Sequence, residues 1–180
     1  MLELQSPSPV KVFAGALWSE QEHWLTAVKQ MENKWGTVDA RRQPVEFTET
    51  DYYYPEMGPE LKREFVSFAN LQSPAELSSF KLLTNSIEQQ SCHLDKRTVN
   101  IDVGYLDLHK IVLASTKPAP HKIYLDKGIW ADMTLMFHRG DFEGFAWTFP
   151  DFKAGNYNDF FRQVRELYKK ALRPHLNCST

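Results

Sequence analysis

The spacing of apolar residues changes several times along the chain, which predicts both strands and helices. Residues 10–17 (VKVFAGAL) are almost continuously apolar, as in a buried strand. A helix is predicted next, from four apolar residues at helical spacing: Trp24, Val28, Met31 and Trp35. Gly36 is expected to end this helix.

Two sequence patterns are typical of helix starts. In residues 19–22 (SEQE), Ser19 is expected to be an N-cap with Glu22 as its capping-box partner. In residues 73–76 (SPAE), Pro74 takes the first helical position, where its missing N–H does no harm. The second helix then carries an apolar stripe made of Leu77, Phe80, Leu83 and Ile87.

Three further strands complete a recognisable order of elements. Residues 44–50 alternate, with Val45 and Phe47 on one face, and predict the second strand. Residues 63–68 and 98–103 predict the third and fourth. The order β-α-β-β-α-β is that of the ferredoxin-like, split βαβ arrangement.

The rest of the chain adds to this core. Asp107 is expected to cap a short helix over residues 108–114. An antiparallel meander is predicted over residues 121–125, 129–137 and 142–148, and a closing helix over residues 157–172. We therefore predict one α+β domain over residues 10–173, with a ferredoxin-like βαββαβ core, between a flexible leader (1–9) and a frayed tail (174–180).

Composition narrows the class of protein. A chain of 180 residues can bury a sufficient core without disulfides or structural metals. A net charge of -2 argues against a general nucleic-acid binder. The two cysteines, Cys92 and Cys178, do not suggest a disulfide framework. Without a signal peptide or an apolar run of about 20 residues, we expect a soluble, cytoplasmic protein and no membrane association.

Several catalytic and binding motifs are missing. The chain has no P-loop, no G-x-G-x-x-G after a strand, no C-x-x-C and no G-x-S-x-G elbow. Residues 33–36 (NKWG) begin like a guanine-reading motif, but Gly36 replaces its Asp. Known nucleotide and zinc signatures therefore do not define a site.

Asp102 is the first candidate site residue. Alternation along the fourth strand places Asn100 and Asp102 on one face and Ile101 on the other. Gly104 is expected to break the strand and let Tyr105 turn. Such an Asp can serve a functional site, or it can lie on a solvated sheet face or cap a turn.

Asp51 and Glu56 form the second candidate. The bend between them could bring the two carboxylates together to hold a hard cation such as Mg²⁺. They could equally cap backbone N–H groups in the turn. Residues 52–54 (YYY) are more typical of packing than of base stacking.

The third group is basic: Lys62, Arg63, Arg97, Lys110, Lys117, His121 and Lys122. Those in residues 110–122 bracket a loop that could grip a phosphate or a carboxylate. His121 is the candidate for proton transfer, although a His beside a strand can also be structural. Residues 147–152 (WTFPDF) are expected to seal the closing helix against the sheet.

Six segments in fixed order resemble a known family. They are FTETDYYYPEMGPELKR (47–63), NIDVGYL (100–106), KIVLASTK (110–117), HKIYL (121–125), GIWADMTL (128–135) and WTFPDF (147–152). Over residues 9–172 the chain resembles the prokaryotic family called domain of unknown function 4416. The family has no established activity and implies no catalytic residues, although some members are labelled GTP-binding.

The chain departs from the pattern of that family at several positions. Family members usually have Pro at Val103, Glu at Asp132 and Arg at Lys122, where lysine lacks the bidentate fork of arginine. They also usually have Tyr at Phe149 and Phe152.

The leading hypothesis is a protein that binds, or acts on, a small anionic ligand such as a nucleotide or phosphorylated metabolite. The proposed residues are Asp102 and His121 for catalysis, Asp51 and Glu56 for a metal, and Arg63, Asn100, Tyr105, Lys110, Lys117 and Lys122 for the ligand. The alternative is a non-catalytic protein–protein interaction or assembly module, with oligomers possible. It rests on three tryptophans expected at the surface: Trp18, Trp130 and Trp147.

Overall fold

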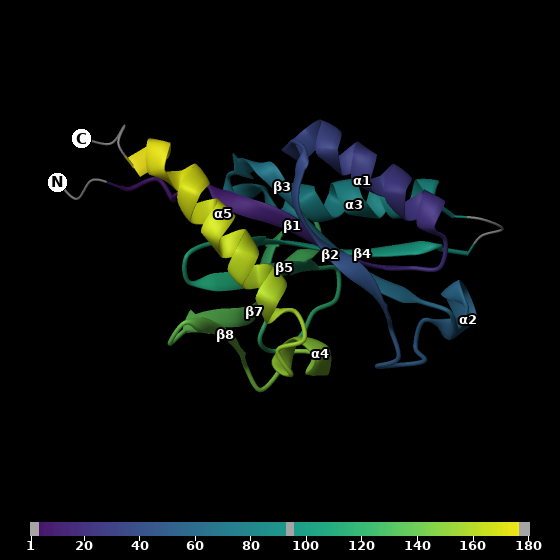
Figure 1. Ribbon diagram of the computed structural model, residues 1–180. Coiled ribbons are helices and arrows are strands. Elements are labelled where there is room, and N and C mark those ends of the chain that lie inside the picture. The colour runs from purple at the N-terminus through teal and green to yellow at the C-terminus, as the bar shows by residue number, and fades with distance from the viewer. Residues whose placement is uncertain (1–3, 93–95, 177–180) are drawn as a thin grey trace.

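An eight-stranded antiparallel sheet with helices on both faces makes up the computed structural model, which describes residues 4–92 and 96–176 (Figure 1). The strands are β1 Val10–Trp18, β2 Val38–Glu46, β3 Lys62–Gln72, β4 Val99–Leu106, β5 Lys110–Ser115, β6 Ile123–Asp126, β7 Ile129–His138 and β8 Asp141–Gly144. The helices are α1 Gln21–Trp35, α2 Tyr54–Met57, α3 Leu77–Gln90, α4 Pro150–Lys153 and α5 Asn158–Leu176, with a 3-10 turn, η1, at Pro74–Glu76. The predicted α+β class is confirmed.

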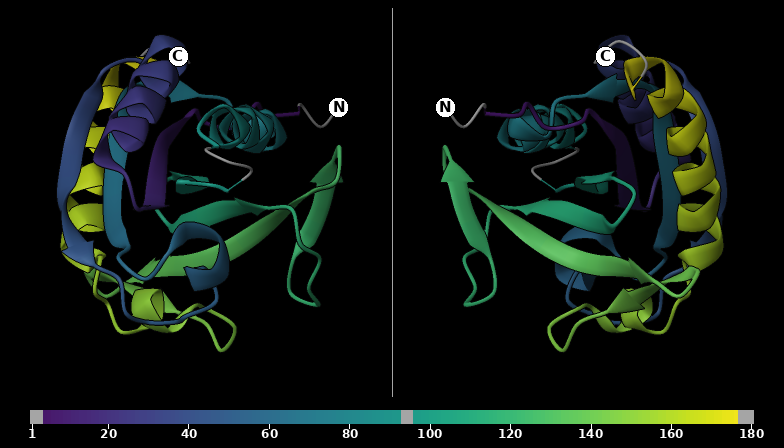
Figure 2. Two further views of the ribbon diagram at one scale, coloured as in Figure 1. Left: turned by 90° about the vertical axis from the view of Figure 1, so that its right-hand side faces the viewer. Right: turned by 90° about the vertical axis from the view of Figure 1, so that its left-hand side faces the viewer.

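The strands lie in the order β2-β3-β1-β4-β5-β7-β6, and β8 pairs with β7. Strand β7 is long enough to serve β6 near Ile129 and β8 near Phe137. The segments expected to form a meander are therefore strands of this sheet. The sheet curls so that α3 lies inside its curve and β6 faces α3 across it (Figure 2).

Each face of the sheet has its own apolar core. Helices α1 and α3 cover one face, where Trp24, Met31, Trp35 and Phe80 are buried. Helix α5 covers the other face through Phe161 and its neighbours. The apolar stripes predicted for α1 and α3 are confirmed as core contacts. Burying one face of a helix in this way supplies most of its stability.

Several local predictions were wrong. Ser19 does not cap α1, whose N-cap is Glu20 without a side-chain hydrogen bond; instead the Ser19 hydroxyl donates to the carbonyl of Thr98. The second strand is β2, which begins before residue 44 and ends at Glu46.

The expected helix over residues 108–114 is also wrong, because this segment is strand β5. Asp107 accepts hydrogen bonds from the backbone N–H groups of His109 and Lys110, in the turn before that strand. Gly104 does not break β4 but lies within it, opposite Leu113 of β5.

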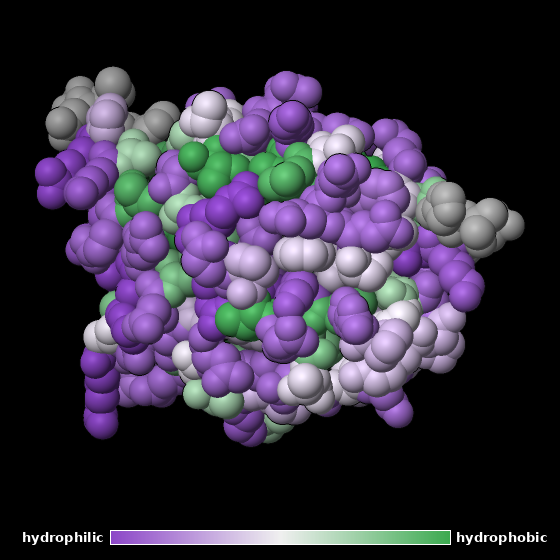
Figure 3. Space-filling model, turned by 45° about the vertical axis from the view of Figure 1, so that its right-hand side comes forward, coloured by the Kyte–Doolittle hydropathy of each residue, from purple (hydrophilic) through white to green (hydrophobic). Residues whose placement is uncertain are grey.

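Most of the surface in Figure 3 is hydrophilic, and hydrophobic residues reach it in separate patches. Trp18, expected at the surface, is buried, whereas Trp147 is exposed. The exposed Cys92 is a free thiol, and Cys178 lies outside the described residues. Among the described helices, none has the length and apolar character needed to cross a membrane.

Candidate functional site

A gap in the sheet creates the candidate site. Strand β4 pairs with β5 only from Gly104 to Leu106, although β4 begins at Val99. Among the described residues, the first part of β4 therefore has β1 on one side and no strand on the other. Backbone groups on such a free edge need other partners.

Two charged side chains of α3 supply those partners. Lys81 Nζ donates to the carbonyl of Ile101 at 2.7 Å, and Glu88 Oε1 accepts from the Ile101 N–H at 2.9 Å. The two side chains are buried and lie 3.5 Å apart as an ion pair. This pair binds the β4 edge in place of a neighbouring strand.

A cavity of about 680 Å³ opens beside this edge, and we call it the β4 cleft. Residues of α3, β4, β5 and four connecting segments meet there. Its walls are formed by Thr50, Tyr52, Tyr53, Lys81, Asn85, Glu88, Arg97, Asn100, Asp102, Ala114, Ser115, Thr116, Lys117, Pro118, Lys122 and Phe149. Four residues predicted for the site line this one cleft: Asn100, Asp102, Lys117 and Lys122.

Arg97 organises the charges at one end of the cleft. Its Nε and Nη2 donate to both carboxylate oxygens of Glu56, at 2.6 and 2.7 Å. Its Nη1 donates to Glu88 at 3.2 Å and to Asn100 Oδ1 at 3.0 Å. These hydrogen bonds hold the pKa of Glu56 below its usual value and raise the pKa of Arg97.

Arg63 contacts the cleft residue Asp102 from outside the cleft. Its guanidinium is buried, and Nη1 donates to Asp102 Oδ2 at 2.9 Å. It also lies 4.9 Å from the centre of the Phe65 ring and 5.8 Å from that of Phe152. Burial, the largest effect, acts to lower the pKa of Arg63, but Asp102, Tyr157 and Asp151 together outweigh it and the pKa is raised. Arg63 thus supports Asp102 and does not itself line the cleft.

Two lysines of the connection between β5 and β6 line the cleft. Lys122 Nζ donates to Ser115 Oγ at 2.9 Å and lies 3.3 Å from the buried carboxylate of Asp132. Lys117 Nζ contacts the hydroxyl of Tyr52 at 3.2 Å. Within the described ranges, Lys117 is the cleft cation that makes no ion pair with a carboxylate.

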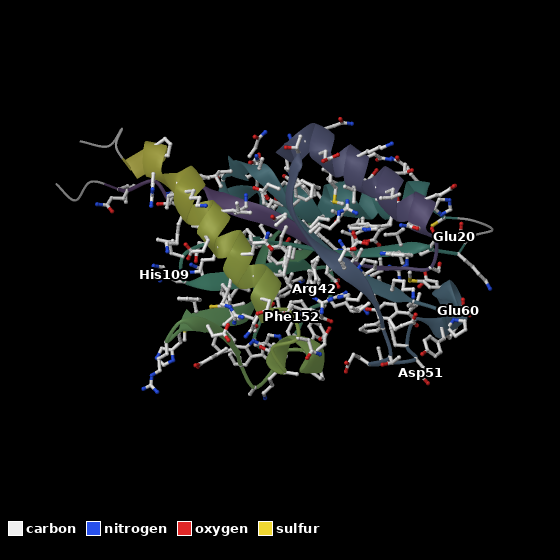
Figure 4. The ribbon with its side chains drawn as sticks, viewed as in Figure 1. Glu20, Arg42, Asp51, Glu60, His109 and Phe152 are labelled. Carbon is white, nitrogen blue, oxygen red and sulfur yellow. The ribbon has the colours of Figure 1, made fainter. Side chains whose placement is uncertain are left out.

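Other predicted residues lie elsewhere. Tyr105, Lys110 and His121 line a separate cavity. Figure 4 shows Asp51 on the side that carries α2, whereas His109, next to Lys110, lies on the opposite side. The predicted Asp51–Glu56 metal pair is not part of a larger cluster, since residues 4–92 and 96–176 contain no group of three or more His, Cys, Asp or Glu side chains that could hold a metal.

Three charged residues of the site escaped the sequence reasoning: Lys81, Glu88 and Asp132. Lys81 and Glu88 lie two helical turns apart, beside the apolar stripe of α3, and are buried. Charged residues on the core side of a helix are rare unless they are paired. Two charged residues two turns apart beside an apolar stripe could therefore have indicated a buried ion pair from the sequence.

The comparisons with known proteins give one match. The model of a family described as "Domain of unknown function (DUF4416)" matches residues 8–168. No curated protein and no solved structure matches significantly. Since the match covers most of the 180 residues, the chain belongs to the domain of unknown function 4416 family.

Proposed function

We propose that the β4 cleft binds a small anionic ligand of the nucleotide or phosphorylated-metabolite class. The charge of its walls carries the proposal. Four cations, Lys81, Arg97, Lys117 and Lys122, line it against two carboxylates, Glu88 and Asp102. Carboxylates just outside the wall balance Arg97 and Lys122, so the excess positive charge comes from Lys117. A concave site with excess positive charge concentrates anions.

The cations differ in how free they are to bind a ligand. Lys81 and Arg97 already pair with Glu88, and Lys122 lies beside Asp132. Lys117 is exposed, and among the described residues its Nζ contacts Tyr52 and no carboxylate. We therefore place the phosphate or carboxylate of the ligand between Lys117 and Lys122.

The remaining walls suit the neutral part of such a ligand. Asn85, Asn100 and Thr116 offer uncharged donors and acceptors. Tyr52 and Phe149 line the cleft and are exposed, so a planar ring could stack on either. These features favour a ligand with a ring and an anionic group over a bare inorganic ion.

Catalysis on the ligand is part of the same proposal. Asp102 borders the cleft and would act as a general base, oriented by Arg63. His121 borders the neighbouring cavity and would act only on a ligand that spans both. A Mg²⁺ ion at Glu56 would compete with Arg97, which donates to both carboxylate oxygens, so Mg²⁺ belongs in the test as a variable.

A thermal-shift screen tests the binding proposal. Nucleotides and sugar phosphates, each with and without Mg²⁺, are added to the wild-type chain. A ligand at about 100 times its dissociation constant adds roughly 2.7 kcal/mol, or about 5–10 °C for a domain of this size. Lys117→Gln with Lys122→Gln should remove the shift, and Lys170→Gln, on the exposed side of α5, should keep it. If no compound raises the melting temperature, or if the double variant retains the shift, the proposal fails.

A second candidate function, protein–protein interaction, is favoured by strand β6. Ile123, Tyr124 and Leu125 are all exposed, and β6 is a terminal strand of the sheet. An exposed apolar edge strand can pair with another chain. Sedimentation over a range of concentrations tests self-association, and Tyr124→Lys should abolish it. A monomer at every concentration would reject assembly into oligomers.

We also propose that β1 to β4 with α1 and α3 form a ferredoxin-like core. The order β2-β3-β1-β4, with every pair antiparallel, and the position of both helices on one face support it. Cross-strand NMR contacts from Ala14 to both Val66 and Val103 test the central pairing; their absence would exclude it.

A further inference from the structure

A second cavity of about 590 Å³ lies on the concave face of the sheet. Its floor comes from three neighbouring strands, through Val112 of β5, Ala131 and Met133 of β7, and Ile123 of β6. This is the face that curls around α3 in Figure 2. A cavity of this size accommodates a small organic ligand.

The polar groups of this cavity include basic side chains. Lys110 and His121 line it, and among the described residues no Asp or Glu does, although Lys110 Nζ also pairs with Asp107 just outside the cavity. The β4 cleft, in contrast, includes Glu88 and Asp102 in its wall. An apolar floor with positive charge at its border matches a molecule that has an apolar body and one anionic group.

Trp147 gives the cavity a fixed aromatic wall. Its ring stacks on His121, with 5.2 Å between centroids and 16° between planes, and on Phe145 at 4.8 Å and 4°. Its Nε1 donates to the carbonyl of Met133 at 3.1 Å. The ring is therefore held in place before any ligand arrives, which reduces the entropic cost of binding.

The cavity is distinct from the β4 cleft but borders it. The buried Asp132 stands between them, with Oδ1 3.6 Å from His121 Nε2 and Oδ2 3.3 Å from Lys122 Nζ. His121 lines the second cavity and Lys122 lines the cleft. One carboxylate therefore positions a basic side chain in each site.

We propose that this cavity binds a small amphipathic monoanion, an aromatic or aliphatic carboxylate or sulfonate. The apolar body lies on Val112, Ala131 and Met133, beside the ring of Trp147. The anionic group lies near Lys110 and His121. This site and the β4 cleft take different ligands, so each proposal can fail without the other.

Fluorescence titration with 8-anilinonaphthalene-1-sulfonate tests the site. The probe should bind the wild-type chain saturably, at one site. Met133→Glu puts a negative charge on the exposed floor and should weaken binding by about tenfold or more. Leu25→Glu, on helix α1 and about as exposed as Met133, should change it less than about twofold.

A neutral analogue separates charge from apolar contact. N-phenyl-1-naphthylamine has the same rings without the sulfonate and should bind about tenfold more weakly. Ile123→Glu repeats the floor test with a more exposed residue, should Met133→Glu fail to fold. Equal affinity of the two probes, or equal effects of Met133→Glu and Leu25→Glu, would overturn the proposal. Loss of probe binding as the chain dimerises would instead assign this face to a second copy.

Discussion

Arg63 and Asp102 form an ion pair across an intervening strand. Arg63 is on β3 and Asp102 on β4, and β1 lies between these strands, yet Arg63 Nη1 is 2.9 Å from Asp102 Oδ2. The arginine side chain is almost wholly buried, whereas that of Asp102 is 35% exposed. A buried charge depends strongly on such a partner.

Asp102→Asn should therefore destabilise the fold as well as alter the cleft. The variant keeps an acceptor for Arg63 but removes its ion-pair partner. We expect the free energy of unfolding to fall by about 2 kcal/mol in urea titrations. Asp126→Asn, at an exposed turn, should change it by less than about 0.5 kcal/mol. Equal effects of the two changes would mean that the Arg63–Asp102 pair adds nothing.

The Glu56–Arg97 pair predicts a pH dependence. Because Arg97 holds the pKa of Glu56 below its ordinary 4.5, the folded state binds this proton less tightly than the unfolded state. The stabilisation is complete above pH 4.5 and is lost as the pH falls through the lower folded-state value. Glu56→Gln should cost about 1 kcal/mol at neutral pH, given partial exposure of the pair. Urea titrations should show the difference in unfolding free energy between Glu56→Gln and wild type disappear in acid. A difference that does not change with pH would contradict the proposed effect of the Glu56–Arg97 pair.

Amide exchange can test how the β4 edge is held. Glu88→Ala removes the acceptor of the Ile101 N–H and should lower stability by about 3 kcal/mol. Exchange at Ile101 should rise by about tenfold relative to Ala14, which lies within β1. Gln89→Ala, on the exposed side of α3, should leave the ratio of the Ile101 to the Ala14 exchange rate unchanged. The same ratio in Glu88→Ala as in wild type would mean that the hydrogen bond from Ile101 to Glu88 does not protect the edge.

Gly104 allows β5 to approach β4 closely. A Cβ at this position would lie 2.4 Å from the carbonyl oxygen of Val112, a backbone atom that cannot rotate away. Gly104→Ala should therefore lower stability by about 1–3 kcal/mol. At Gly144 the nearest atom would be 3.2 Å away, so Gly144→Ala should cost less. Thermal unfolding compares the two, and equal melting temperatures would contradict the close approach.

Much of the fold follows from periodicity, because long amphipathic segments such as α1 and α5 must bury one face. Short apolar runs are ambiguous, and residues 108–114 show why. An Asp that accepts backbone hydrogen bonds can begin a helix or close a hairpin turn. Asp107 does the second, a choice that depends on pairing of β5 with β4 and β7.

The site was predictable only where local geometry decides it. Alternation along β4 placed Asn100 and Asp102 on one face, and both line the cleft. The contact of Arg97 with Glu56 joins residues 41 apart in sequence and depends on how the β2–β3 connection folds back. Lys110 and His121 were grouped with Lys117 by sequence proximity, but the curl of the sheet directs them into another cavity.

The Lys81–Glu88 pair has a consequence for what can enter the β4 cleft. An open strand edge normally accepts a further strand, from a peptide or from another copy of the chain. Here the N–H and the carbonyl of Ile101 are already occupied by two side chains fixed to α3. An incoming peptide would have to break both hydrogen bonds to pair with Ile101. The gap therefore disfavours pairing with a polypeptide backbone while leaving the space beside it open to small molecules.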